Sequence, residues 1–264
     1  MFDNVEFDIY FFFFFVASVR RWQILKDNVK GLTLKALSTT RWESHIESVK
    51  PLRFSPVEIR EALLQLAGID KKDFITVSSA KGLARNVFGD FEFLLSLVIW
   101  YEILFAFNKT SKLLQSDDMQ ISVAIGEVKG LIAWLDHYRE SGFNAALVDA
   151  SDMAEKLNVP AVFPEKRPIK RPRFFDESTS EPSPPSSGEE LFIVEFFLYI
   201  VDQAKASLVK RFEQYQLYDD IFGFLFTSKR LESLDDCALR AACIHLESFL
   251  TPWGEFRCGW GKVV

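Results

Sequence analysis

A chain of 264 residues with 48% hydrophobic and 26% charged residues has the composition of a soluble globular protein. The net charge of −6 argues against strong duplex-DNA binding by the chain as a whole, although a local basic patch can still form. Three cysteines, all beyond residue 236, exclude a disulfide framework and favour a reducing compartment.

The first hydrophobic stretch is predicted to be a buried helix rather than a targeting segment. Ile9–Val19 contains five consecutive phenylalanines, and the residues before it are acidic where a signal peptide is basic. The run is also shorter than the roughly 20 apolar residues that a membrane span needs. The helical pattern continues, so one helix over 5–27 is expected.

The next helix is predicted to begin beside Thr40-Arg41-Trp42. Thr40 offers a hydroxyl group for the N-cap, and Glu43, three residues later, completes the pattern of a capping box. Arg41 would then lie in the first turn of a helix that runs towards residue 50, and Pro51 is expected to interrupt it.

Five further helices are predicted at 57–66, 78–87, 91–114, 117–142 and 145–157. Phe91–Leu114 is apolar nearly all round, but Glu92, Glu102 and Lys109 interrupt it, so a central core helix is expected rather than a membrane span. Gly142 is expected to end the helix that follows.

The C-terminal third begins with a polar, Pro- and Ser-rich stretch, 163–188, which is predicted to be a disordered loop. Helices are expected again at 189–216 and 234–250, with a short apolar segment between them. The βαβ alternation of a parallel sheet and period-2 strands are not visible. The predicted fold is therefore all-α, a helical bundle with one long disordered loop.

Seven segments, taken in order, resemble hAT-superfamily transposase-derived proteins of the zinc-finger MYM-type 1-like and TTF-finger groups. They are RRWQIL (20–25), LKALSTTRWESHIESVKPLRF (34–54), FEFLLSLVIWYEILFAFNKTSKLLQSDDMQI (91–121), WLDHYRESGFNAAL (134–147), KRPRFFDE (170–177), VEFFLYIVDQAKASLVKRF (194–212) and DIFGFL (220–225). The likeness covers about 11–250. It rests on the ordered set rather than on any one segment.

The resemblance implies an RNase H-like core whose sheet is interrupted by a large helical insertion. In such transposases three carboxylates hold two divalent metals that activate the attacking oxygen. By family order two of these carboxylates precede RRWQIL and the third follows residue 264. The chain is accordingly expected to consist of 1–54, an opening segment with a remnant of the RNase H-like core; 55–162, helical insertion; 163–188, basic loop; 189–250, insertion continued; and 251–264, irregular tail.

The same resemblance assigns DNA contacts to Arg41 and Trp42. An indole face can stack on a flipped, unpaired base, and a guanidinium group can fork onto phosphate. The alternative is that Trp42 is a partly buried helix anchor and that Arg41 pairs with a neighbouring glutamate. His45 stands where the family pattern has Arg, which removes one positive charge from this face.

A basic cluster in the long loop is a candidate phosphate-contacting arm or nuclear-localisation signal. It contains Lys166, Arg167, Lys170, Arg171 and Arg173. The alternative is a solvated loop whose charge is balanced by the acidic residues that follow.

No metal site and no cofactor are predicted. Cys237, Cys243 and His245 do not have the spacing of a standard zinc module and are expected to be ordinary residues with free thiols. The adjacent acidic pairs, such as Asp219-Asp220 and Asp235-Asp236, are expected at helix starts and solvated turns.

Together these patterns predict a catalytically inactive, transposase-derived protein with residual binding to single-stranded or hairpin DNA. The alternative is a structural or protein-interaction module, or a decaying fragment, that self-associates through aromatic faces. Neither an enzyme nor a membrane protein is expected. Nuclear localisation follows from the resemblance, and a cytoplasmic location is the alternative.

Overall fold

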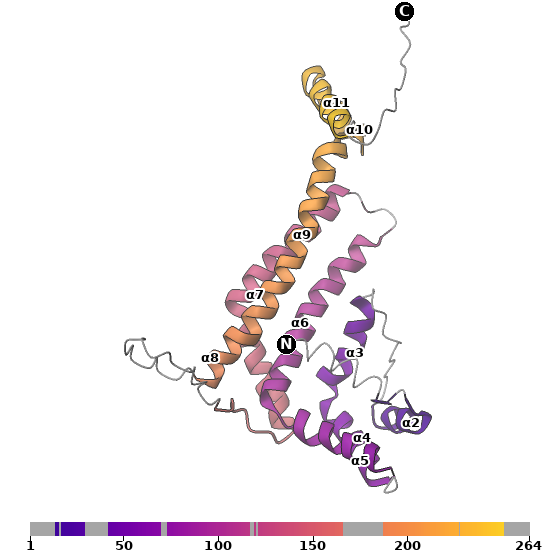
Figure 1. The fold of residues 1–264 in the computed structure, drawn as a ribbon, viewed down its shortest axis with the longest axis vertical. Coiled ribbons are helices and arrows are strands. Elements are labelled where there is room, and N and C mark those ends of the chain that lie inside the picture. Colours follow the sequence, from indigo (N-terminus) through magenta and orange to yellow (C-terminus); the bar gives the residue numbers. More distant parts are fainter. Residues whose placement is uncertain are drawn as a thin grey trace, which may run out of the picture.

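The computed structural model describes residues 14–15, 17–29, 42–69, 73–116, 119, 121–165, 187–226 and 228–250. Within these ranges the chain forms helices joined by short turns and contains no strand, which confirms the predicted all-α class. Figure 1 shows an elongated arrangement in which long helices run along the molecule.

The helices are α2 (Val19–Asn28), α3 (Trp42–Phe54), α4 (Pro56–Ile69), α5 (Phe74–Gly82), α6 (Phe91–Leu114), α7 (Ile121–Lys156), α8 (Gly188–Phe192), α9 (Tyr199–Phe222), α10 (Ser228–Glu232) and α11 (Asp236–Leu250). Two π-helical stretches, η1 (Leu83–Val87) and η2 (Ile193–Leu198), continue α5 and join α8 to α9. A 3-10 turn, η3 (Gly223–Leu225), follows α9.

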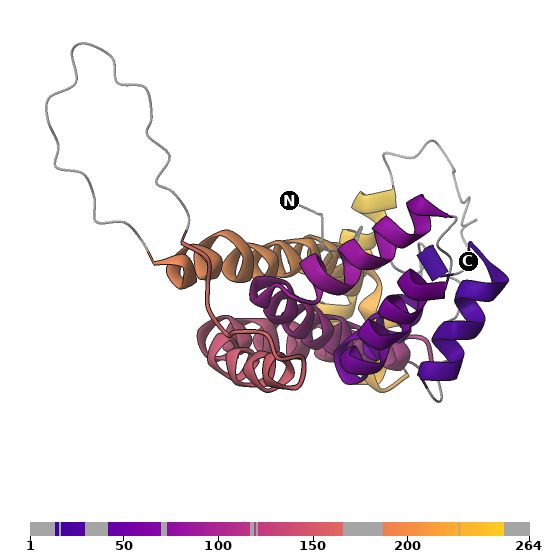
Figure 2. The same ribbon diagram turned by 90° about the horizontal axis from the view of Figure 1, so that it is seen from below.

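The long helices α6, α7 and α9 lie side by side, with α7 in contact with both of the others. On the other side of α6 lies α3, and α2, α4 and α5 gather at the lower end in Figure 1. At the upper end α9 extends beyond α6 and carries α10 and α11. The view in Figure 2 shows the same layers from below.

A group of aromatic rings packs several of the 27 phenylalanines between the long helices. Phe91 meets Phe163 edge-on with ring centroids 5.4 Å apart, and Phe163 lies 5.8 Å from Phe192. Phe143 of α7 then meets Phe197 at 5.5 Å. These rings tie α6, α7 and η2 together, and the edge-on geometry is favoured by the ring quadrupole.

The predicted single helix over 5–27 is wrong at Ser18. Helix α2 begins only at Val19, and the Ser18 backbone is extended, with φ of −146°. Ser18 accepts the first bond of α2, from the amide of Trp22 at 3.0 Å, which is the role of an N-cap residue. Ser18, a residue type favoured at helix N-termini, therefore separates α2 from the apolar run before it.

Gly142 does not end a helix, contrary to the prediction. It lies inside the 36-residue helix α7, where a Cβ atom would come within 2.4 Å of the Tyr138 ring. The missing side chain allows that ring to lie against the helix backbone. Packing, and not helix termination, accounts for this glycine.

Pro51 does not interrupt α3 either, since the helix continues to Phe54. Proline removes its own amide donor and crowds the carbonyl four residues earlier, but the Pro51 carbonyl still accepts from the Ser55 amide at 2.8 Å. Val49 and Leu52 on either side are fully buried, so packing compensates for the lost hydrogen bond.

The predicted helix over 189–216 is longer than expected. A capping box between Ser187 and Glu190 starts α8, with both hydrogen bonds at 3.1 Å. The helical course then continues through η2 to Phe222, so most of the predicted apolar segment after residue 216 is helix. The short helix α10 was not predicted.

Several predictions lie outside the described residues. These are the N-cap at Thr40, Arg41 itself, most of the loop over 163–188 with its basic cluster, and the tail over 251–264. The predicted division at 54/55 stays a prediction. At that point α3 ends and α4 begins, and both helices contribute to one buried core.

Candidate nucleic-acid interface at the start of α3

Trp42 is the first residue of α3, and Arg41 lies outside the described residues. Helices α3 and α6 are in extensive contact and run in opposite directions (Figure 1). The helical repeat puts position 42 on the side of α3 that carries Ile46 and Val49. Trp42 is thus placed at one end of a well-anchored helix.

Helix α3 is held by a buried face. Ile46, Val49 and Leu52 are at most 4% exposed, and Ser48 is buried beside them. His45 is half-buried, and its burial lowers its pKa below the ordinary 6.5. The imidazole is therefore neutral at pH 7 and adds no positive charge to the start of the helix.

A polar network fixes the other end of α3. The Arg53 guanidinium pairs with Asp149 of α7 and lies over the Phe54 ring, 5.5 Å from its centroid. Arg53 also acts electrostatically on the half-buried Glu102 of α6. This arginine joins three helices, and its charge is directed inwards rather than towards a ligand.

Two groups beside this network have raised pKa values. Burial raises the pKa of Glu102, Arg53 lowers it and Asp149 raises it further, for a net rise. Burial also raises the pKa of Tyr138, with smaller contributions from Glu102 and Asp149. The Tyr138 hydroxyl is buried and has no hydrogen-bond partner among the described residues. The Arg53–Asp149 ion pair ties α3 to α7, while the charge of Glu102 is only partly offset by Arg53.

The residues considered for metal binding do not converge. Cys237 and Cys243 are free and exposed. Among the described residues no group of three or more His, Cys, Asp or Glu side chains is placed to hold a metal ion. Nothing in this part of the chain builds a two-metal centre.

The described acidic pairs have structural roles. Asp219 receives a two-pronged contact from Arg230, at 2.5 and 3.0 Å, which lowers the pKa of its carboxyl group. Asp235 accepts from the amide of Ala238 at 2.7 Å and so caps α11. The expectation that such pairs occupy helix starts and turns is confirmed at Asp235. It is wrong at Asp219-Asp220, which lie inside α9, where Asp219 is held by Arg230.

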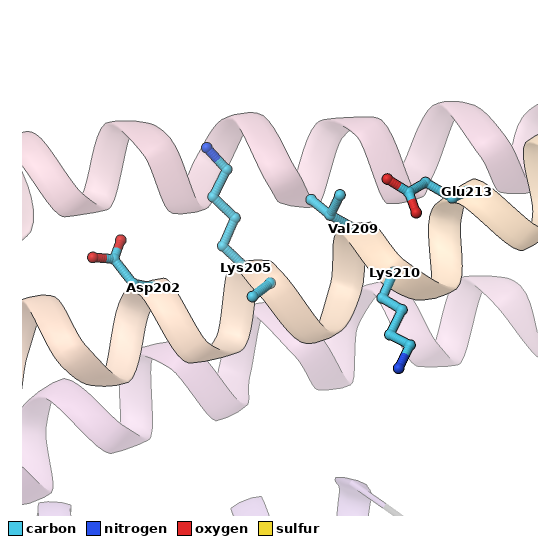
Figure 3. A pocket seen from close by; sticks show the side chains of 6 residues that line it. Asp202, Lys205, Val209, Lys210 and Glu213 are labelled. Carbon is cyan, nitrogen blue, oxygen red and sulfur yellow. The ribbon is translucent and has the colours of Figure 1, made fainter.

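A shallow hollow on α9 carries alternating charges (Figure 3). It is lined by Asp202, Lys205, Ala206, Val209, Lys210 and Glu213. Asp202 accepts two hydrogen bonds from Arg139, at 2.7 and 3.1 Å, and Lys205 pairs with Asp136. The charges of Asp202 and Lys205 are therefore paired with residues of α7. These ion pairs hold α9 against α7, and we assign the hollow no catalytic role.

Sequence reasoning missed an exposed aromatic row on α3 and α6. Phe54 meets Tyr101 edge-on with ring centroids 5.2 Å apart, and Tyr101 stacks on Phe105 at 6.2 Å. Phe54 is 60% exposed and Phe105 is 50% exposed. The contact joins residues 47 positions apart in the sequence, so local periodicity could not reveal it.

Comparison with protein-family models, with curated proteins and with solved structures finds no match for this chain.

Proposed function

We propose that this chain is a catalytically inactive relative of hAT transposases that contacts single-stranded or hairpin DNA at the start of α3. The observation that carries the proposal is the ordered series of seven sequence segments, with Arg41-Trp42 as its most specific element. The nuclear location proposed for the chain rests on the same resemblance.

The architecture supports a role in presenting this motif. Helix α3 is anchored along Ile46, Val49 and Leu52 and is tied at its far end by Arg53. A rigid support reduces the entropy lost when a contact residue is ordered on binding. The positive end of the helix dipole also lies at the start of α3, where it favours a phosphate group.

The proposal includes no strand-transfer chemistry. The resemblance places the three metal-binding carboxylates outside the segments that match. Two described carboxylates on the helices packed around α3, Glu102 and Asp149, interact with Arg53, and Asp149 is paired with it. Binding without catalysis is therefore the proposed activity.

The test is binding of a fluorescent hairpin DNA with an unpaired flank, followed by anisotropy at low salt. Arg41→Ala and Trp42→Ala are expected to weaken binding about five- to tenfold each, and Trp42→Phe less, because a phenyl ring still stacks. Arg85→Ala and Arg240→Ala, two exposed arginines elsewhere, serve as controls. Equal affinity for Trp42→Ala and the wild type would remove Trp42 from the interface.

A structural role for Trp42 is the main rival at this position. The helical repeat places it on the side of α3 that carries buried Ile46 and Val49, which suits an anchor. An anchor predicts that Trp42→Ala lowers the melting temperature while Arg41→Ala does not. If Trp42 stacks on a base instead, Trp42→Ala should change the melting temperature little and clearly weaken DNA binding.

A second function, protein interaction, is favoured by the far end of α9. Helix α11 is amphipathic, yet none of its residues is buried. We call the apolar side chains exposed here the distal surface: Tyr215, Leu217, Tyr218, Leu225, Phe226, Leu231, Ile244, Phe249 and Leu250. Apolar patches of this kind mark interaction sites in soluble proteins. We propose self-association through the distal surface as the alternative activity.

A further inference from the structure

The aromatic row on α3 and α6 is more exposed than a core would leave it. Tyr101 is buried at its centre, whereas Phe54 and Phe105 on either side each expose at least half of their surface. Two exposed rings held by a buried third form a firm platform, because Tyr101 fixes both orientations. Base rings stack on such faces with little dependence on sequence.

Positive charge continues the row along α6. Lys109 and Lys112 follow Phe105 by four and seven residues, so all three share one side of the helix. Each is exposed. Alternation of a stacking ring with ammonium groups is the pattern by which proteins follow an unpaired, negatively charged strand.

The row lies along α3 and α6, and α3 begins at Trp42. Phe54 at the end of α3 meets Tyr101 of α6, and the two helices run in opposite directions (Figure 1). Trp42 is twelve residues before Phe54, a rise of about 18 Å. The start of α3 is thus brought level with the last turns of α6, where Lys109 and Lys112 lie.

We propose that Phe54, Phe105, Lys109 and Lys112 form a second contact, the α6 strip, for an unpaired DNA strand that continues from the start of α3. The inference rests on the proposed function and extends it from one motif to a path. Phe105 stacks on a base, and the two lysines contact the phosphates beside it.

Acidic residues border this strip. Glu47 of α3 and Glu102 of α6 both act electrostatically on Tyr101. Glu102 is half-buried, and burial raises the pKa of its carboxyl group although Arg53 lowers it. Glu47→Gln is therefore expected to tighten binding about two- to threefold at low salt.

The experiment measures binding of fluorescent dT15 to the full chain by anisotropy, with rU15 and a blunt duplex as comparisons. Phe105→Ala is expected to weaken dT15 binding about five- to tenfold, and Lys109→Ala about two- to threefold. Phe74→Ala and Lys81→Ala on α5 remove a ring that is more exposed than Phe105 and an exposed charge at the other end of the molecule, and should not change the affinity.

A direct readout comes from Phe105→Trp, which places an indole at the proposed stacking position. Stacked bases quench indole fluorescence, so addition of dT15 should quench this variant more than the wild type. Arg41→Ala is measured in parallel, and thermal melts of each variant confirm that the fold is retained.

The outcomes separate the two proposals. Weakening by Phe105→Ala with extra quenching of Phe105→Trp supports the α6 strip. If the wild type binds and Arg41→Ala weakens it while Phe105→Ala does not, the strip is overturned and the motif stands. If the wild type binds neither these probes nor the hairpin DNA at low salt, both are overturned, and binding of the hairpin without dT15 overturns the strip alone. Tighter binding of rU15 than of dT15 would overturn DNA as the ligand.

Discussion

At the scale of single residues, Gly142 gives the sharpest stability test. A Gly-to-Ala change inside a helix ordinarily stabilises by about 0.5–1 kcal/mol. At Gly142 the new Cβ atom would lie 2.4 Å from the Tyr138 ring, and Trp134, stacked on that ring at 4.9 Å, restricts its retreat. Gly142→Ala is therefore expected to lower the free energy of unfolding by about 1–3 kcal/mol in chemical denaturation.

The control lies in the same helix. A Cβ atom at Gly130 meets nothing within 4 Å, so Gly130→Ala should raise stability by about 0.5–1 kcal/mol. Equal stabilisation by the two alanines would contradict the packing role of Gly142.

Glu102 gives a residue-scale prediction about pH. Burial raises the pKa of its carboxyl group in the folded state above the ordinary 4.5. Stability from this group is fully present below pH 4.5 and is lost as pH rises through the folded-state pKa, because the buried group must then carry a charge. Glu102→Gln is expected to melt at a higher temperature than the wild type at pH 7, with the gap closing near pH 4. A gap that is constant with pH would contradict this account, and Glu61→Gln on the exposed side of α4 is the control.

At the scale of elements, helix α11 should be the least stable of the long helices. None of its residues is buried, whereas α6 has eleven buried residues. Hydrogen exchange of backbone amides tracks such differences in local opening. The amides of α11 are expected to exchange orders of magnitude faster than those of α6. Similar protection in the two helices would show that α11 is covered in solution.

The sequence predicted which segments are helical better than it predicted where each helix begins and ends. The all-α class and the core helix over 91–114 follow from breaker-poor, periodic apolar stretches, so they were accessible from local pattern. Gly142 was misjudged because the Tyr138 ring, one turn earlier, packs against its backbone, and Pro51 because buried side chains on both sides hold its helix in place. The Phe54–Tyr101 contact was invisible because it depends on how α3 crosses α6.

At the scale of the whole molecule, α6 is the one described helix that is long and apolar enough to cross a membrane. Of its most apolar window, 61% is buried by the surrounding helices, and a core helix passes the same test of length and composition. The expected absence of a membrane partner stays a prediction.

Self-association is the prediction that belongs to the distal surface. The mass measured by light scattering is expected to rise with protein concentration, and Leu217→Glu combined with Ile244→Glu should return it towards that of one chain. Both side chains are more than half exposed, so the changes leave the fold intact. Val148→Glu, at a 62% exposed position on α7, is the control and should leave the mass unchanged. A wild type that is monomeric at every concentration would contradict this alternative.

The central claim, DNA contact at the start of α3, is tested most directly by the salt dependence of hairpin-DNA binding by the wild type and Arg41→Ala. The account predicts measurable binding at low salt that weakens as salt rises, and a salt slope lower by about one for Arg41→Ala, because one phosphate contact is lost. Absence of binding at low salt, or an Arg41→Ala curve that overlays the wild type, would contradict it.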